Sequence, residues 1–241
     1  MDGIILAGGA GTRMRPLTLD RPKALLHVQG QPILAWSLMS LRGLADRALI
    51  VVHAFKEQIA DWMRAQAIFA DYQLIEQRPQ PLGTGHALDC CREHLAGDDF
   101  LVINGDDLYP AAALRELSRH DFGLLASARM DYANYGVVLR DRAGAFLRID
   151  EKPPPGTYAA PALCNSGAYK FTRAVFQYQL PKSERGEFEI TDYVTAAARD
   201  RPVMVVDSPF WLPIGDPPAL EAAQTVDVAR WIPPPPANTV L

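Results

Sequence analysis

The sequence predicts an α/β fold in which a mostly parallel sheet is flanked by helices and joined to a smaller antiparallel lobe. Short apolar runs alternate with stretches of helical periodicity through the first half of the chain, a pattern typical of parallel sheets with helices on both faces. A glycine-rich loop follows the first apolar run. After residue 131 two strand-like runs are separated by one short turn, which predicts a hairpin.

The length and composition fit one large domain. The chain has 241 residues, 49% of them hydrophobic, which is enough for a sizeable core. We expect a single domain over residues 1–228, with a first part over about 1–130 and the lobe over about 131–228. The proline-rich tail at 229–241 is expected to be extended or disordered.

Charge, cysteines and the N-terminus narrow the class of protein. The net charge of −4 disfavours a nucleic-acid-binding protein, which needs a basic surplus, and leaves a local site for a small anion. Cys90, Cys91 and Cys164 lack metal-ligand spacing and are expected to be free or buried thiols. The N-terminus lacks a basic signal sequence, and no segment approaches the roughly 18 unbroken apolar residues of a membrane span. We therefore expect a cytoplasmic protein without a nucleic-acid or membrane partner.

The elements of the first part follow from apolar runs and turn residues. Runs that end at glycine or at acidic turns predict buried strands. A helix is expected to begin at Pro32, because proline suits the first helical position and apolar residues recur at helical spacing after it. Strands are predicted at 3–7, 24–28, 47–53, 72–77, 100–104 and 123–129, and further helices at 54–66, at 86–95 and around Leu114 and Leu117.

The second part begins with the hairpin, whose strands are predicted at 135–140 and 146–152 around the turn DRAGA. Apolar periodicity predicts the remaining elements in the same way. They are a strand at 165–171, a short helix at 172–178, a helix at 189–200, a strand at 203–207 and a final helix at 217–230 that begins with proline.

The loop GGAGTRMRPLTLDRPK, directly after the first strand, predicts a phosphate-binding site. Glycine backbone at the carboxyl edge of a parallel sheet can approach a phosphate closely. Neither known phosphate loop fits, since no GKS or GKT occurs and Met14 replaces the third glycine of the dinucleotide fingerprint. Arg13 and Lys23 flank the turn and could clamp a polyphosphate, with Arg15 and Arg21 close by. Four cations in one loop favour this interpretation over solvated surface charges.

The segment GGAGTRMRPLTLDRPKAL resembles the signature of the sugar-1-phosphate nucleotidylyltransferases, G-G-x-G-T-R-x-x-P-x-T-x-x-x-P-K-x-L, at every fixed position. The resemblance covers roughly residues 1–225 and implies a Rossmann-like, glycosyltransferase-A-like fold with a nucleotide-binding half and a sugar-binding lobe. It also implies that Arg13 holds the triphosphate and that Lys23 binds phosphate in the transition state, both as catalytic residues. The residues that it assigns to the nucleotide here are Leu6, Ala7, Gly8, Gly9, Gly11, Thr12 and Arg13.

The segment EQRPQPLGTGHAL, residues 76–88, contributes the expected base contacts. An amide such as that of Gln77 offers a donor and an acceptor to the edge of a base. Gly83 and Thr84 fit either the same loop or the cap of the helix that follows. The run LGTGHA is similar to that of N-acetylglucosamine-1-phosphate uridylyltransferases, which favours uracil and therefore UTP.

The strand FLVIN ends in GDD, which delivers carboxylates to the same edge of the sheet. Buried carboxylates need a partner or a metal, and Mg²⁺ accepts one or two of them when substrate phosphates complete its shell. Asp106 matches the metal-binding aspartate implied by the resemblance, whereas Asp107 either assists or caps the next turn. A plain Asx turn is the alternative.

The lobe carries the residues expected to bind the sugar phosphate. The resemblance implies a backbone contact of Gly136 with the sugar, a hydroxyl contact for Glu151, a phosphate contact for Lys152 and a sugar contact for Asn165. A hairpin with an exposed ion pair is the alternative. The run GEFEITD, residues 186–192, fits either this family or a helix N-terminus with acidic residues.

One position departs from the family pattern. The resemblance implies an aspartate in W-x-D-x-G as the second metal ligand, but the chain has Pro213 between Trp211 and Gly215. Asp216 or Asp107 could replace it, or Asp106 and the phosphates could hold Mg²⁺ alone.

The predicted function is transfer of a nucleotidyl group from a nucleoside triphosphate to a sugar 1-phosphate, with Mg²⁺ as cofactor. A non-catalytic sugar-nucleotide-binding regulator is one alternative, because of Pro213. An A-type glycosyltransferase is another, although its usual D-x-D is missing where Asp106 and Asp107 are adjacent. The sequence predicts neither the sugar nor the oligomeric state.

Overall fold

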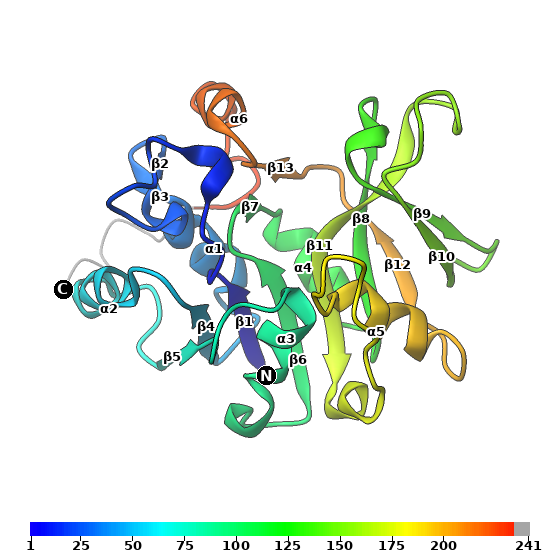
Figure 1. The fold of residues 1–241 in the computed structure, drawn as a ribbon, viewed down its shortest axis with the longest axis horizontal. Helices are drawn as coiled ribbons and strands as arrows, with labels where there is room; N and C mark the ends of the chain where they lie inside the picture. The colour runs from blue at the N-terminus through cyan, green and yellow to red at the C-terminus, as the bar shows by residue number, and fades with distance from the viewer. Residues whose placement is uncertain (234–241) are drawn as a thin grey trace.

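A nine-stranded sheet forms the centre of the molecule, for which a computed structural model describes residues 1–233 (Figure 1). Its first four strands are β1 (Asp2–Leu6), β4 (Arg47–Val52), β5 (Tyr72–Glu76) and β6 (Asp99–Asn104). They run parallel in the order β6-β1-β4-β5. Leu6 pairs with Val51 and with Asn104, so the carboxyl ends of neighbouring strands are level. The loops that follow β1 and β6 therefore leave the sheet side by side.

The other strands extend the same sheet. β11 (Ala162–Thr172) runs antiparallel to β6 and to β8 (Gly123–Arg129), and β12 (Met204–Asp207) runs parallel to β8. β9 (Gly136–Arg140) and β10 (Phe146–Glu151) form the predicted antiparallel hairpin, which meets β11 through the pair Cys164–Val137. The predicted sheet flanked by helices, with an antiparallel addition after residue 131, is confirmed.

Helices cover both faces, and alternate strand residues supply the two cores. Ile5, Ile50 and Ile103 face α1 (Ile33–Leu41), α2 (Lys56–Ala65) and α4 (Ala111–Leu117). Ile4, Leu49 and Val102 belong to the other core, with α3 (Thr84–Asp89) and α5 (Ile190–Ala197) (Figure 1). This alternation follows from the period of two along a strand. A third core surrounds Met14, Trp36 and Ile214.

Several predicted boundaries were wrong for local reasons. The expected strand at 24–28 is a 3-10 turn, η2 (Lys23–Leu25), and a short hairpin of β2 (His27–Val28) and β3 (Gln31–Pro32), with the two residues between them at positive φ. The expected helix at 86–95 is divided into α3 and a 3-10 turn, η3 (Arg92–His94). The short helix expected at 172–178 is the 3-10 turn η5 (Arg173–Gln177). Smaller elements are η1 (Thr12–Met14), β7 (Asp107–Leu108), η4 (Tyr132–Asn134) and β13 (Leu212–Pro213).

The end of the described chain packs against the core instead of extending away from it. The predicted helix at 217–230 ends early, as α6 (Pro217–Ala223), because the chain turns and buries Val228 and Ile232. Trp231 stacks on Phe210, and its carbonyl accepts from the N–H of Ala111. The expected extended or disordered tail is therefore wrong for 229–233, and its remainder, 234–241, lies outside the described residues.

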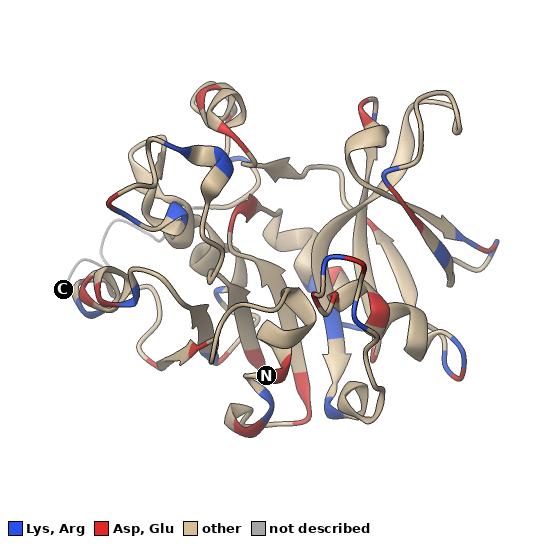
Figure 2. Ribbon diagram, in the orientation of Figure 1, with Lys and Arg blue, Asp and Glu red and all other residues tan. Residues whose placement is uncertain are grey.

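The three thiols are free, as the sequence predicted; Cys91 and Cys164 are buried. Acidic and basic residues are interspersed among the elements (Figure 2). Within residues 1–233, the helices all fall short of the length and apolar character that a bilayer crossing demands.

Candidate functional site

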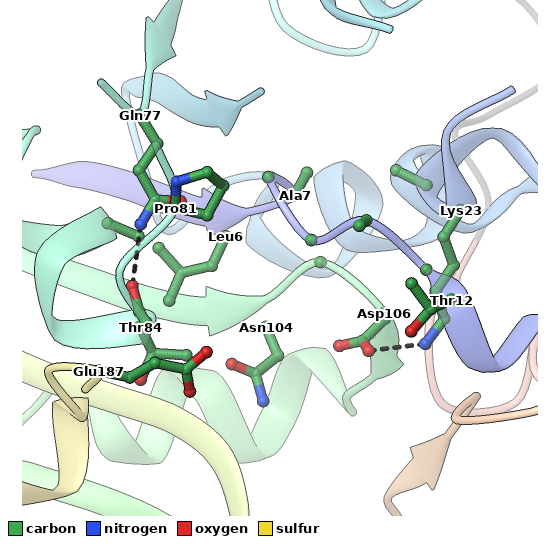
Figure 3. A pocket seen from close by; sticks show the side chains of 18 of the residues that line it. Leu6, Ala7, Thr12, Lys23, Gln77, Pro81, Thr84, Asn104, Asp106 and Glu187 are labelled. Atoms are coloured by element: carbon green, nitrogen blue, oxygen red, sulfur yellow. Dashed lines mark hydrogen bonds and ion pairs between the residues drawn. The ribbon is translucent and has the colours of Figure 1, made fainter. Parts of the chain in front are cut away.

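A cavity of about 550 Å³ opens where β1 and β6 end. Figure 3 shows Gln77, Pro81 and Thr84 at one end of it, and Lys23, Thr12 and Asp106 at the other. Every residue predicted to bind nucleotide or metal lines this cavity. These residues are Leu6, Ala7, Gly8, Gly9, Gly11, Thr12, Arg13, Lys23, Gln77, Gly83, Thr84 and Asp106.

The glycine-rich loop presents unused backbone donors to the cavity. Among residues 1–233, the N–H groups of Gly8 to Arg13 make no hydrogen bond. The loop is anchored through the carbonyl of Gly11, which accepts from the hydroxyl of Thr18 at 2.7 Å and from the N–H of Met14 at 2.9 Å. Successive free N–H groups form a concave anion-binding surface. The exposed guanidinium of Arg13 lies beside Gly215, at the rim.

Lys23 and Asp106 meet at the same end. The Nζ of Lys23 donates to Oδ2 of Asp106 at 2.7 Å, joining the loop after β1 to the turn after β6. The Lys23 side chain is 10% exposed and that of Asp106 is 39% exposed. At this end of the cavity the lysine and the carboxylate therefore form a balanced pair, with the guanidinium of Arg13 at the rim. Of the other basic residues in the loop, Arg15 and Arg21 do not line the cavity, and Arg21 is paired with Asp20.

The sequence suggested that Asp107 either assists Asp106 or caps the next turn. In the structure it does neither. It lies buried in β7, where its Oδ2 accepts from the hydroxyl of Tyr109 at 3.2 Å and from Nδ2 of Asn104 at 3.4 Å. Burial, reinforced by the negative charge of Asp106, raises the pKa of Asp107 to about 8. A carboxyl in this state suits hydrogen bonding inside the protein better than binding a cation.

The resemblance implied an aspartate as second metal ligand where this chain has Pro213, and the backbone around Pro213 is hydrogen-bonded to β7 and the turn before it. Pro213 pairs with Asp107 across β13 and β7, and the N–H of Ile214 donates to the carbonyl of Asp106. Asp216, the other candidate, caps α6 by accepting from the N–H of Ala219 at 2.9 Å. Neither Asp107 nor Asp216 lines the cavity.

At the opposite end, the amide nitrogen of Gln77 is held by two partners. The side chain is 3% exposed, and its Nε2 donates to the carbonyl of Gly83 at 2.9 Å and contacts Nδ1 of His86 at 3.1 Å. Gly83 has φ +94°, and a Cβ there would lie 2.5 Å from the carbonyl oxygen of Phe188. Only glycine permits both this backbone conformation and this close approach.

Residues 182–189, here called the strap, cross over the start of α3. The N–H of Phe188 donates to the carbonyl of Leu82 at 2.8 Å, and its carbonyl accepts from the N–H of Gly85 at 2.7 Å. The hydroxyl of Thr84 accepts from the N–H of Ile190 at 2.9 Å, and no side chain caps α3. The segment does begin a helix, with Gly83 as the N-cap residue of α3, but the Thr84 hydroxyl serves the start of α5 instead of capping α3.

The strap brings charged residues to the cavity that the sequence did not assign to it. Arg185 donates to Glu189 at 2.7 Å and lies 3.5 Å from Glu187, and all three line the cavity, as Figure 3 shows for Glu187. GEFEITD was the signal that could have identified the two glutamates. Nothing in the sequence pointed to Asn104, which also lines the cavity directly before the GDD turn.

The predicted sugar-phosphate residues lie beside this cavity and not in its lining. Gly136 and Glu151 pair across β9 and β10, and Lys152 follows at a φ of 43°. Partial desolvation, then the charge of Glu189, raises the pKa of Glu151, so the hairpin adjoins the strap. The Nδ2 of Asn165 donates to the hydroxyl of Tyr169 at 2.8 Å. Contacts of these four residues with a sugar stay a prediction.

Comparison with known proteins identifies one family model and several relatives that are similar to this chain in sequence. A family model described as nucleotidyl transferase matches residues 2–229. The bifunctional protein GlmU of Methanocaldococcus jannaschii is 32% identical over 222 residues, which are 90% of this chain and 52% of the relative. A bifunctional sugar-1-phosphate nucleotidylyltransferase/acetyltransferase of Sulfurisphaera tokodaii is 28% identical over 240 residues, 96% of this chain and 55% of that protein.

The fold has solved counterparts of similar length. The structure of a UDP-glucose pyrophosphorylase complexed with UDP-glucose superposes with a TM-score of 0.80 at 19% identity, covering 92% of this chain and 96% of that one. The chain spans about half the length of the curated relatives it matches.

Proposed function

Because the chain belongs to the nucleotidyl transferase family, we propose that it transfers a nucleotidyl group from UTP to a sugar 1-phosphate, giving a nucleoside diphosphate sugar and pyrophosphate. One observation carries the proposal. A single cavity combines the free N–H groups of the glycine-rich loop, the Lys23–Asp106 pair and, at its far end, the fixed amide of Gln77. This arrangement suits a molecule with a polyphosphate at one end and a base at the other.

The nucleotide would lie along the cavity. The base would lie between the backbone of Leu6 to Gly8 and the loop of Gln77, Gly83 and Thr84. The triphosphate would follow the loop past Gly9, Gly11 and Thr12 towards Arg13, because these residues line the same cavity. The relative from Sulfurisphaera tokodaii carries sugar-1-phosphate nucleotidyl transfer in its name, which supports the second substrate.

The reaction would need positioning and charge neutralisation more than covalent help. An oxygen of the sugar 1-phosphate attacks the α-phosphorus in line, a new P–O bond forms, and the bond from the α-phosphorus to the bridging oxygen breaks. Pyrophosphate leaves with that bonding pair. Arg13 and Lys23 would neutralise the nucleotide and the leaving group, and Lys152 the attacking phosphate. Gly136, Glu151 and Asn165 would orient the sugar.

Asp106 fits a role in holding Mg²⁺. Its carboxylate is the one acidic group at the phosphate end of the cavity lining, and oxygen ligands with substrate phosphates suit this ion. When bound, the ion would supply positive charge between the phosphates of the two substrates. The Pro213 side chain offers no ligand, and Asp107 and Asp216 do not line the cavity, so Asp106 would hold the ion together with the phosphates.

The proposal is tested by mixing each nucleoside triphosphate with a set of sugar 1-phosphates and Mg²⁺, and measuring pyrophosphate. We expect pyrophosphate with UTP and at least one sugar 1-phosphate, and none when EDTA is added. Binding of nucleotide with no pyrophosphate from any pair would contradict the proposal and favour a regulatory protein, which the proline at 213 would explain. Sugar transfer from a nucleotide sugar would instead indicate a glycosyltransferase.

A further inference from the structure

We propose that His86 is a positioning residue that makes the site select uracil or thymine over cytosine. It would do so by holding the amide of Gln77 with its oxygen towards the base. This inference rests on the proposed function, in that the cavity binds the base of a nucleoside triphosphate at its Gln77 end.

The orientation of the Gln77 amide follows from its partners. The amide nitrogen carries two hydrogens; one is directed to the carbonyl of Gly83 at 2.9 Å and the other to Nδ1 of His86 at 3.1 Å. Turning the amide over would place its oxygen against that carbonyl oxygen, and two acceptors repel each other. Among residues 1–233, Oε1 has no hydrogen-bond partner.

His86 can accept at Nδ1 in one neutral form only. In that form the hydrogen lies on Nε2, which is 3.9 Å from Sγ of Cys90. Burial raises the pKa of the Cys90 thiol, so the sulfur stays uncharged beside the ring. A chain of contacts from Cys90 through His86 to Gln77 thus sets which amide atom remains free.

The free atom lies against Gly8, which also lines the cavity. Gln77 lines it and is 3% exposed, and Oε1 lies 3.1 Å from where a Cβ on Gly8 would stand. An acceptor here matches the N3–H of uracil or thymine. Cytosine has a lone pair at N3, so it would leave the nearly buried Oε1 unpaired or opposed, and buried unpaired acceptors are unfavourable.

The test measures equilibrium dissociation constants of UTP and CTP for the full chain by calorimetry, with Mg²⁺ and without sugar phosphate. We expect the parent chain to bind UTP about tenfold or more tightly than CTP. His86→Leu removes the acceptor, so the ratio should fall at least threefold. His86→Asn offers Oδ1 near the position of Nδ1 and should keep the ratio. His94→Leu is the matched control, because His94 makes the same contact with Gln73 at 3.0 Å outside the cavity.

A second measurement needs no variant. UTP methylated at N3 lacks the donor, and the parent chain should bind it at least tenfold more weakly than UTP. Equal binding of UTP and CTP by the parent, equal binding of the methylated nucleotide, or an unchanged ratio in His86→Leu would each overturn the inference. Pyrophosphate release would still support the proposed function in those cases. If no nucleotide binds at all, the inference and the proposed function are both overturned.

Discussion

Lys23 is the residue on which the charge balance of the cavity depends. It is the one lysine in the cavity lining of the described chain, and its side chain is almost covered. Its Nζ is held by one carboxylate at 2.7 Å and can exchange that partner for a phosphate oxygen. Under the proposed function, we expect Lys23 to contribute to the transition state more than to the folded state, and the two contributions can be measured separately.

Lys23→Met should lower the rate of pyrophosphate release about 100- to 1,000-fold, the usual effect of removing one transition-state donor. The free energy of unfolding should fall by no more than about 2 kcal/mol, because Asp106 keeps contact with solvent. Steady-state assays and urea denaturation give the two quantities. Arg21→Met is the control, since Arg21 is exposed and paired only with Asp20; it should change the rate less than about twofold. A Lys23→Met enzyme that turns over normally would contradict the role given to this lysine.

At this scale the sequence predicted part of the site. The signature after β1 identified Arg13 and Lys23, and the segment EQRPQPLGTGHAL identified Gln77 and Gly83, because each motif is local in the chain. Arg185 was missed because it reaches the cavity from about 100 residues away, through contacts of the strap that no local pattern encodes.

Among the elements, the contact between the strap and the start of α3 joins the two halves of the chain. It depends on backbone hydrogen bonds to Phe188, which require the strap to lie directly over Gly83.

Gly83→Ala should therefore separate the two segments. The new Cβ would meet a carbonyl oxygen at 2.5 Å, and φ +94° strains any side-chain-bearing residue. We expect a loss of about 1–3 kcal/mol in unfolding free energy and a weakening of UTP binding of about tenfold or more. Urea denaturation and calorimetry test this. Gly97→Ala is the control, since a Cβ there has nothing within 4 Å. Wild-type behaviour of Gly83→Ala would show that the strap contact does not shape the base site.

The start of α6 offers a test of which carboxylates hold the cation. Asp216→Ala should cost about 1 kcal/mol of stability through loss of the helix cap. The Mg²⁺ concentration for half-maximal activity should stay unchanged, whereas Asp106→Asn should raise it strongly. A tenfold rise for Asp216→Ala would instead identify Asp216 as a ligand.

Element types were predicted better than element ends. β1, β4, β6 and β8 follow from apolar runs whose burial on both faces leaves little choice of structure, whereas β5 is mostly half-buried. α6 was predicted too long, because its helical pattern continues into residues that turn back to pack on Met14 and Trp36. Tertiary packing, which propensity does not contain, decided that boundary.

For the molecule as a whole, one sheet carries both cores, and each core holds one buried thiol. Cys91 lies in the core with α3 and α5, and Cys164 in the core with α1 and α4. In a Cys90→Ser chain, both thiols should react with a thiol reagent only on global unfolding, and at the same rate. Mass spectrometry of partly labelled protein measures this. Faster labelling of one thiol would show that one side of the sheet opens alone.

The same thiols predict how stability depends on alkaline pH. Burial raises the pKa of Cys164 to about 11 and that of Cys91 further, above the ordinary value of 9.0. Between pH 9 and 11 the unfolded chain therefore binds fewer protons than the folded one, and the free energy of unfolding falls as pH rises. Cys164→Ala should show a smaller fall over this range, measured by urea denaturation at pH 8 and pH 10.5.

The fold class could be predicted because alternating strands and helices leave few topologies for a parallel sheet. The path of β11 could not be predicted from the sequence. It runs for eleven residues between β6 and β8, and its register shifts between Asn165 and Tyr169. Gly167 adopts φ +78° in this shift, where a Cβ would collide with Asn104. Such irregularities depend on partners distant in sequence.

The ion pair of Lys23 and Asp106 also bears on how ligands enter. A lone anion that bound the ammonium group would leave the partly exposed carboxylate without its ion-pair partner, and a lone divalent ion at the carboxylate would leave the almost covered ammonium group without its own. A triphosphate already complexed with its counter-ion offers a new partner to each at once, so neither charge is left uncompensated. Joint arrival is thus the route that we expect to be favoured, and free phosphate, free pyrophosphate and uncomplexed nucleotide should compete only weakly for the site.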